Sequence, residues 1–477
     1  MNSIWTETVQ LPVFPVLEGR KEADAVIIGG SLTGILTADA LRQAGADVIV
    51  LEANQIGHGQ TAGTTAKLTA QHGLKYHTLI EKLSFDAAAQ YAAANLAAVD
   101  RLRALVQSRG IDCDFRDCTS FLFAVEAPGP LQEEYHACRR LGLDVFLTGD
   151  TELPFSAEAL GLRRQATFHP LKLLGALASD LTIYENSRVI SVGGQTVHTA
   201  RGTVSAKTIL FCCHYPFPKL PGFYFLRQHQ ERSYVLALKH TLPLQDYYLG
   251  IDGEKLSLRP CGAFLLLGGS GHRTGENALG GNYEVLETAA KRLWPQCRVS
   301  ARWSAQDCIP LDGIPFIGRF SKGHPNWLIA TGFQKWGMSS SVLASMVLSD
   351  LAQDLPPMPE AALFSPQRFH PRASAKHLAN DTVHAVYSLS RRLLEPGRVP
   401  VDTLPPGHGG IVEIDEKKRG IYRDEQGQLL SVSVKCPHLG CQLEWNPEEK
   451  TWDCPCHGSR FDIHGTRLNG PANTELR

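Results

Sequence analysis

The sequence lacks any apolar run close to the roughly 20 residues that a membrane-spanning helix needs. It also lacks a signal peptide, because the N-terminal stretch MNSIWTETVQ has no basic segment followed by an apolar one. Neither sign of charge dominates, since the formal net charge is −1, and this gives no indication of nucleic acid or an acidic membrane as partner. We therefore expect a cytoplasmic protein with no transmembrane segment and no nucleic-acid partner.

The chain is too long for one ordinary core, because 477 residues indicate two or three domains. Hydrophobic residues at 43% and charged residues at 20% are typical of a globular protein. A proline-rich stretch, residues 354–374, marks a boundary. We expect one large region over residues 1–355, a linker with a helix from about 375 to 394 within residues 356–395, and a small domain over residues 396–477.

A strand, a glycine turn and a helix follow one another in ADAVIIGGSLTGILTADALRQAGADVIVLEAN, residues 23–54, and predict a βαβ unit. Backbone N–H groups of such a turn bind a pyrophosphate, and an acid at the end of the next strand accepts a hydrogen bond from a ribose. Ser31 stands where the G-x-G-x-x-G fingerprint has glycine, but the surrounding elements still predict dinucleotide binding. The residues of this site are Gly29, Gly30, Ser31, Thr33, Gly34 and Glu52.

The remaining pattern of this large region predicts an α/β fold with an inserted sheet. A long helix is expected over residues 84–109, with Ser84 as N-cap and Gly110 as its stop. Short alternating runs in residues 112–155 and 224–267 predict strands of a mostly antiparallel sheet. The α/β pattern returns between these runs, so the dinucleotide-binding domain is discontinuous in sequence.

Two later stretches, DCIPLDGIPFIG and NWLIATGFQKWGMSSS, resemble flavin motifs of the D-amino-acid oxidase-like superfamily of FAD enzymes. In that superfamily, the second motif feeds a helix whose N-terminus stabilises negative charge on the reduced flavin. EANQIGHGQTAGTTAKLTAQHG is similar to the loop under the flavin ring, and NSRVISV to the strand that meets adenine. The resemblance covers most of residues 20–350 and implies non-covalent FAD. It places the cofactor against Thr64, Thr65, Ala66, Lys67, Val189, Asp312, Gly313, Gly332, Lys335, Trp336, Gly337 and Met338.

The same resemblance implies how the large region is divided. A Rossmann-like FAD-binding domain would use residues of about 20–110, 165–220 and 300–352. An α+β substrate subdomain with an antiparallel sheet would use about 111–164 and 221–299.

The candidate catalytic residues are Lys335, Lys67 and His72, which fall in the segments expected near the flavin ring. A cation close to the ring would tune flavin redox chemistry. A histidine such as His72 is more often a satisfied polar residue than a base. Three arginines of the presumed substrate region are more often solvated or paired residues than ligands: Arg232, Arg259 and Arg273.

Four of the 12 cysteines are packed between Cys436 and Cys456, in CPHLGC and DCPCHGSRFD, while the others are scattered and predicted to be buried thiols. Such a cluster can be a zinc knuckle, a disulfide staple or an iron–sulfur site. Zinc fingers usually place two cysteines on one loop and two histidines on the other. Here each loop offers one cysteine and one histidine, which is the arrangement of a Rieske [2Fe-2S] centre.

The two loops resemble the Rieske family, whose domain is small and all-β. Ser459 occupies the position that donates a hydrogen bond to a bridging sulfide, and Phe461 replaces a tyrosine donor. The stretch NGPA resembles the proline loop that covers the cluster. The resemblance implies Cys436 and Cys454 on one iron, His438 and His457 on the other, and a disulfide between Cys441 and Cys456.

The whole sequence resembles a bacterial family that joins such a flavoprotein to a C-terminal Rieske domain. We expect FAD-dependent oxidation, as a dehydrogenase or an oxidase, of a small amine, amino acid or related substrate. The electrons would pass singly to the cluster and then to an acceptor protein or a quinone. The alternatives are a reductase- or oxygenase-like system with reverse electron flow, and a non-enzymatic redox relay or sensor.

Overall fold

In the computed structural model, the described residues are 3–371, 373–374, 390, 400–414 and 417–476. The helix that the sequence predicts over about 375–394 lies outside them except for one residue, so it stays a prediction.

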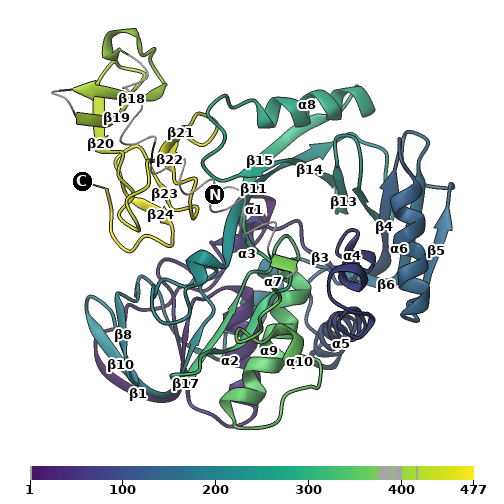
Figure 1. Ribbon diagram of the computed structural model, residues 1–477, viewed down its shortest axis with the longest axis horizontal. Coiled ribbons are helices and arrows are strands. Elements are labelled where there is room, and N and C mark those ends of the chain that lie inside the picture. The colour runs from purple at the N-terminus through teal and green to yellow at the C-terminus, as the bar shows by residue number, and fades with distance from the viewer. Residues whose placement is uncertain (1–2, 372, 375–389, 391–399, 415–416, 477) are drawn as a thin grey trace.

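The first sheet is built around the predicted βαβ unit, in the order β16-β17-β10-β1-β2-β7; β9 also pairs with β10, and β8 pairs with β9 (Figure 1). Strands β17, β10, β1, β2 and β7 run parallel, and β16 pairs with β17 in the antiparallel sense. Alternate residues of β1 enter two cores, because Ile27 packs on the helical side and Val26 and Ile28 on the other. The strands are β1 (Gly19–Ile28), β2 (Val48–Leu51), β7 (Thr182–Tyr184), β8 (Ser191–Gly193), β9 (Thr196–His198), β10 (Gly202–Phe211), β16 (Phe316–Ser321) and β17 (His324–Thr331).

Helices cover one side of this sheet, where α2 packs against α7 and α9, and α9 packs against α5. The predicted long helix is confirmed, since Ser84 caps α5 by accepting a hydrogen bond from the Ala87 N–H, and Gly110 ends it in the left-handed conformation. The helices of this part are α1 (Ile4–Thr8), α2 (Leu32–Gln43), α3 (Gln60–Gly63), α4 (Lys75–Lys82), α5 (Phe85–Arg109), α7 (Pro170–Ala178), α9 (Gly337–Ala352) and α10 (Ala361–Phe364).

The second sheet has nine strands in the order β15-β11-β14-β13-β12-β4-β6-β3, with β5 beside β6. All of its pairs are antiparallel except β12 with β4. Its strands are β3 (Lys67–Leu68), β4 (Arg116–Ala124), β5 (Val145–Thr148), β6 (Glu158–Thr167), β11 (Gln228–Lys239), β12 (Tyr247–Gly250), β13 (Ser257–Cys261), β14 (Phe264–Arg273) and β15 (Arg298–Pro310).

Two helices, α6 (Gly129–Arg140) and α8 (Asn282–Leu293), pack on this second sheet. The prediction of strands throughout residues 112–155 was therefore wrong for α6. The apolar residues of this segment repeat with the period of a helix, and the structure buries Leu131, Ala137 and Cys138 on one side of α6.

The C-terminal domain is all-β, as expected, and consists of two small sheets, β18-β19-β20 and β21-β22-β23-β24. Its core holds Trp445, Trp452 and Phe461 together with the four clustered cysteines. In Figure 1 this domain, drawn in yellow, lies beside β11 and β15. The strands are β18 (Gly409–Ile414), β19 (Lys417–Arg423), β20 (Leu429–Ser433), β21 (Glu444–Asn446), β22 (Thr451–Asp453), β23 (Arg460–Phe461) and β24 (Arg467–Asn469).

Within the described ranges, none of the helices has the length and apolar character needed to cross a membrane. The cytoplasmic setting stays a prediction.

Candidate cofactor sites

A cavity of about 870 Å³ lies where the carboxyl ends of the parallel strands face the second sheet. Cavities of roughly 300–1,000 Å³ are usual for bound small molecules. The wall includes the ends of β1, β2 and β10 on one side and residues of β11, β14 and β15 on the other. Ligands of open α/β sheets bind at this end of the strands.

The glycine positions of the turn after β1 have no room for a side chain. A Cβ at Gly34 would lie 2.0 Å from the Gly29 carbonyl oxygen, and one at Gly29 would lie 2.6 Å from the carbonyl oxygen of Cys212. Ser31, which replaces a glycine of the fingerprint, caps α2 by accepting from the Gly34 N–H and donates to the Cys212 carbonyl oxygen at 3.1 Å. Its hydroxyl is thus engaged inside the turn.

Glu52 lies at the cavity wall at the end of β2, where an acid that binds a ribose is expected. The N–H groups of Gly30 and Asn54 donate to its carboxylate at 2.8 and 2.9 Å. Burial raises the pKa of Glu52 above its usual value despite these hydrogen bonds. The turn, the acid and the helix that follows fit the pyrophosphate and ribose of a dinucleotide.

Most of the residues that the sequence assigned to FAD line this cavity. They are Gly29, Gly30, Ser31, Thr33, Glu52, Thr64, Thr65, Lys67, Val189, Gly332, Lys335, Trp336, Gly337 and Met338. The N-terminus of α9, at Gly337, also lies at the wall, so its backbone N–H groups and positive dipole end are available to a flavin carbonyl.

Four of the assigned residues do not line the cavity: Gly34, Ala66, Asp312 and Gly313. Asp312 is instead buried in a salt bridge, since the Arg368 guanidinium donates to both carboxylate oxygens at 2.8 and 2.9 Å. Burial raises the pKa of this carboxyl group, but Arg368 outweighs the effect and holds it below the usual value. In the described structure Asp312 therefore holds the segment around Arg368 in place and is not exposed to the cavity.

The three candidate catalytic residues have different surroundings. Lys67 lines the cavity and donates to the Ser257 hydroxyl, and burial lowers its pKa to about 7. Lys335 also lines the cavity and forms a salt bridge with Glu231 at 3.2 Å. His72 lies behind the wall, where its ring nitrogens contact Tyr91, Thr69 and Ser339.

Asp307 is a cavity residue that sequence reasoning did not single out. Burial raises its pKa to about 7, with Lys335 opposing the shift. The available signal was its position at the start of the DCIPLDGIPFIG motif, where only the second acid was considered.

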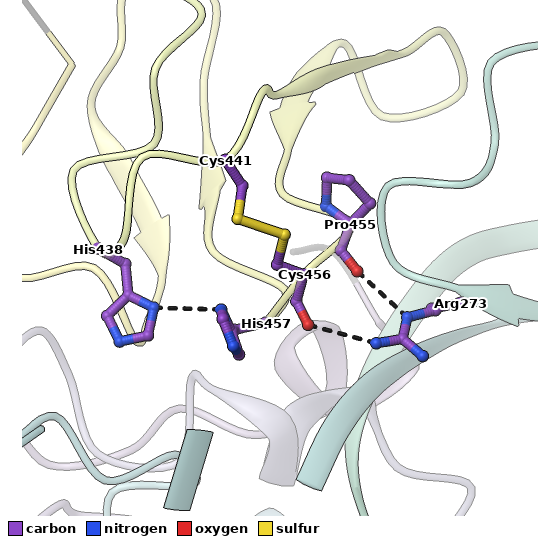
Figure 2. Close-up of a disulfide and its surroundings, with 6 residues drawn as sticks. All are labelled: Arg273, His438, Cys441, Pro455, Cys456 and His457. Atoms are coloured by element: carbon purple, nitrogen blue, oxygen red, sulfur yellow. Dashed lines mark hydrogen bonds between the residues drawn. A yellow bond between two sulfur atoms is a disulfide. The ribbon is translucent and has the colours of Figure 1, made fainter. Parts of the chain in front are cut away.

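The four predicted cluster ligands come together on two loops, and Figure 2 shows the two histidines, His438 and His457. The Nδ1 atoms of His438 and His457 lie 3.3 Å apart, and the buried thiols of Cys436 and Cys454 are within hydrogen-bond reach of each other. Two thiols and two imidazoles on facing loops are the donor set that a Rieske centre requires.

The disulfide between Cys441 and Cys456 joins the two loops beside these side chains (Figure 2). The Sγ atom of Cys454 lies within 4.8 Å of both disulfide sulfurs. Ser459 is fully buried, and its hydroxyl accepts from the Ala472 N–H at 2.9 Å. The serine therefore also ties the ligand loop to the segment that contains NGPA.

Comparison with known families identifies the protein family to which each of these two sites belongs. The FAD dependent oxidoreductase family matches residues 24–351, and the Rieske [2Fe-2S] domain family matches residues 398–477. The chain belongs to the FAD-dependent oxidoreductases and carries a C-terminal Rieske domain. Its predicted α/β and all-β folds, its enzyme class and its two cofactors, FAD and a [2Fe-2S] cluster, are thereby confirmed.

Individual relatives agree with both parts of this FAD-dependent oxidoreductase. The Rieske 2Fe-2S iron-sulfur protein YhfW of Bacillus subtilis is 36% identical over 494 residues, which cover 100% of this chain and 97% of YhfW. The cytochrome b6-f complex iron-sulfur subunit 2 of Trichormus variabilis is 46% identical over 55 residues, or 11% of this chain and 31% of that subunit. Glycine oxidase from Geobacillus kaustophilus shares the fold, with a TM-score of 0.64 at 19% identity over 73% of this chain and 99% of the oxidase.

The histidine side of the Rieske loops faces the flavoprotein. His438 and His457 are only 5% and 8% exposed, and the Phe225 ring lies 5.8 Å from each imidazole. Lys219 donates to the His438 carbonyl oxygen at 2.6 Å. The segment around Lys219 and Phe225 thus covers the edge of the Rieske domain that carries its histidines.

Strand β11 makes the most direct connection between the two parts. The Gln230 amide donates to the carbonyl oxygens of His457 and Gly470 at 2.6 and 3.1 Å. Gln306, on β15, donates to the Gly458 carbonyl oxygen at 2.7 Å. A Cβ at Gly458 would lie 2.6 Å from the Gln230 Cβ, so only glycine permits this approach.

Two of the arginines considered for the substrate region also bind the Rieske domain. Arg273 donates to the carbonyl oxygens of Pro455 and Cys456 at 3.1 and 3.3 Å (Figure 2). Arg232, 1% exposed, forms a salt bridge with Glu449 at 3.1 Å. Burial raises the pKa of Glu449, but Arg232 and Arg460 outweigh this effect and keep it below the usual value. Neither Arg232 nor Arg273 is part of the cavity wall.

Proposed function

We propose that the chain oxidises a small amine, amino acid or related substrate, and that the electrons leave one at a time through the Rieske domain to an acceptor protein or a quinone. FAD accepts the electron pair from such a substrate, and a [2Fe-2S] centre carries single electrons. The observation that carries this proposal is the direct contact between the cavity wall and the ligand loops.

This contact runs through two side chains. His214 lines the cavity and is hydrogen-bonded to Gln230, whose amide donates to the backbone of the ligand His457. Burial lowers the pKa of His214 to about 4, so the imidazole is neutral at physiological pH. A short, fixed connection of this kind supports transfer within one chain, because tethering holds donor and acceptor at a high effective concentration.

The second-sheet side of the cavity offers groups suited to an amino acid or amine. Lys335 supplies positive charge for a substrate carboxylate, and Lys67 adds to it below its pKa of about 7. Asp307, with its pKa raised to about 7, can accept a proton from a substrate ammonium group at its carboxylate oxygen. A neutral amine is the form that loses hydride most readily, so this proton transfer prepares the substrate.

The proposal is tested by mixing the holoprotein anaerobically with a panel of amines and amino acids, while visible absorption reports the flavin and low-temperature EPR the cluster. A true substrate should bleach the flavin and then produce the reduced-cluster signal. A Cys454→Ala variant with intact FAD should bleach without giving that signal. Flavin reduction only after an external donor has reduced the cluster would instead establish reverse flow, and a panel with no bleaching would favour a relay.

A further inference from the structure

One end of the FAD cavity is closed by the Rieske domain itself. The residues that line it there follow one another along β24 and the loop after it: Arg467, Leu468, Asn469, Gly470, Ala472 and Asn473. They belong to the same cavity as the glycine turn and Glu52. The wall is therefore shared between two domains whose family matches end at residue 351 and begin at residue 398.

Arg467 is the charged residue among these Rieske residues, and a second guanidinium of the same cavity wall, that of Arg188, is close enough to act on its charge. Burial, together with the nearby Arg188, lowers the pKa of Arg467 to about 10, and Glu475 opposes this shift. Arg188, whose pKa is also lowered by burial, lies close to Glu52. Two like charges in a partly buried site repel each other unless an anion lies between them.

The hydrogen bonds of these two guanidiniums leave donors for such an anion. Arg188 donates to the Asn54 side-chain oxygen at 3.4 Å, and Arg467 donates to the Ala472 carbonyl oxygen. Both of these hydrogen-bond acceptors are neutral, whereas the carboxylates that act on the two guanidiniums through their charge are Glu475 on both and Glu52 on Arg188. An arginine presents five N–H donors in a planar fork, which matches a phosphate better than a single carbonyl.

We propose that the Rieske domain completes the FAD site, with Arg467 acting together with Arg188 to bind the negatively charged pyrophosphate part of the cofactor. The inference depends on FAD binding, which the family establishes, and is independent of the substrate and the direction of electron flow. It makes FAD affinity a property of both domains, although only the first carries the dinucleotide fingerprint.

The test is the dissociation constant of FAD, measured by flavin fluorescence when FAD is added back to cluster-loaded protein from which the flavin has been removed. Arg467→Gln should weaken FAD binding about tenfold or more, because a charge-assisted contact to phosphate is lost. Arg467→Lys should have an intermediate effect, since charge is kept but the fork is not. Arg419→Gln, on β19 beside Ser431 and away from the cavity, is the matched control.

Iron content and the EPR signal of each variant show whether the Rieske domain remains folded. If Arg467→Gln loses its iron, the comparison of Asn473→Asp with Asn473→Ala decides the question, because Asn473 is an exposed residue of the same wall. The aspartate should weaken FAD binding more than the alanine, and more so at low salt. An FAD dissociation constant within about twofold of the Arg419→Gln value, in whichever variant keeps its cluster, would overturn the proposal.

Discussion

The residues that line the cavity come from positions 28 to 473, whereas the four predicted cluster ligands lie between positions 436 and 457. The FAD site is largely a shape, made by glycine turns, strand ends and the start of a helix. The cluster site is a set of four side-chain atoms on two short loops. An added methyl group should therefore disrupt the FAD site, whereas the removal of a ligand atom should disrupt the cluster site. Substitutions of both kinds test this contrast.

The largest effect is expected when one of the predicted cluster ligands is removed. Cys454→Ala removes a thiolate that no neighbouring group can replace, since Cys441 and Cys456 are joined in a disulfide. We expect complete loss of the cluster, measured as iron and acid-labile sulfide per chain, while FAD is retained. Cys297→Ala, in the turn after α8, should keep its iron. A Cys454→Ala protein with a full complement of iron would show that the ligand assignment is wrong.

In the glycine turn of the FAD site, an added methyl group should be nearly as damaging. Gly34→Ala places a Cβ 2.0 Å from the Gly29 carbonyl oxygen, so the turn must move. We expect a loss of about 1–3 kcal/mol in the free energy of unfolding and of about tenfold or more in FAD affinity. Thermal unfolding and the flavin content after purification measure the two effects. Gly129→Ala, at the start of α6 with no heavy atom within 4 Å of the new Cβ, should change neither.

A smaller effect is expected when the contact between the flavoprotein part and the Rieske domain is weakened. Glu449→Gln leaves the buried Arg232 without its charged partner, which should weaken docking of the Rieske domain by about 1–3 kcal/mol. The observable is the rate at which the reduced-cluster signal appears after the flavin has been reduced, followed by rapid freezing and EPR. Glu425→Gln, which affects the more exposed pair with Lys450, should leave this rate unchanged. Equal rates in both variants would show that electron transfer does not depend on this docked arrangement.

The smallest effect should be a pH dependence at the cavity wall of the FAD-free protein. Burial lowers the pKa of Lys67 to about 7 from a reference value of 10.5, so between these values the unfolded chain binds a proton that the folded chain does not. Stability therefore rises with pH across this window, and below it the folded protein retains a charged, buried lysine. Lys67→Met should raise the thermal midpoint by about 2–4 °C near pH 6.5, and the gain should shrink towards pH 9. Lys239→Met, at the exposed end of β11, should show no such trend.

The cluster site was the easier one to predict, because its ligands and their spacing are contained in two short stretches. The same applies to the glycine turn and to the long helix α5, whose N-cap and C-terminal glycine are local signals. For the ligand loops, the sequence predicted residues that the structure brings within contact distance of one another.

The parts that could not be predicted depend on contacts between distant segments. Gln230 and His457 are separated by 227 positions, and nothing in the spacing of either indicates the other. Arg232 was considered for the substrate region because its strand was assigned to that region, but its side chain forms a salt bridge with Glu449 of the Rieske domain. Asp312 shows the same limit, since its partner Arg368 lies within the proline-rich stretch, past residue 355, where the first region was expected to end.

The order of the two domains along the chain has a consequence for how the protein is made. Residues 467–473 close the FAD cavity, yet they follow the flavoprotein part in sequence. Domains fold as units during synthesis, the N-terminal one first. The flavin can therefore enter while its site is still open on one side, and the arrival of the Rieske domain closes that side behind it. Translation itself would then set the order of assembly, with flavin before iron.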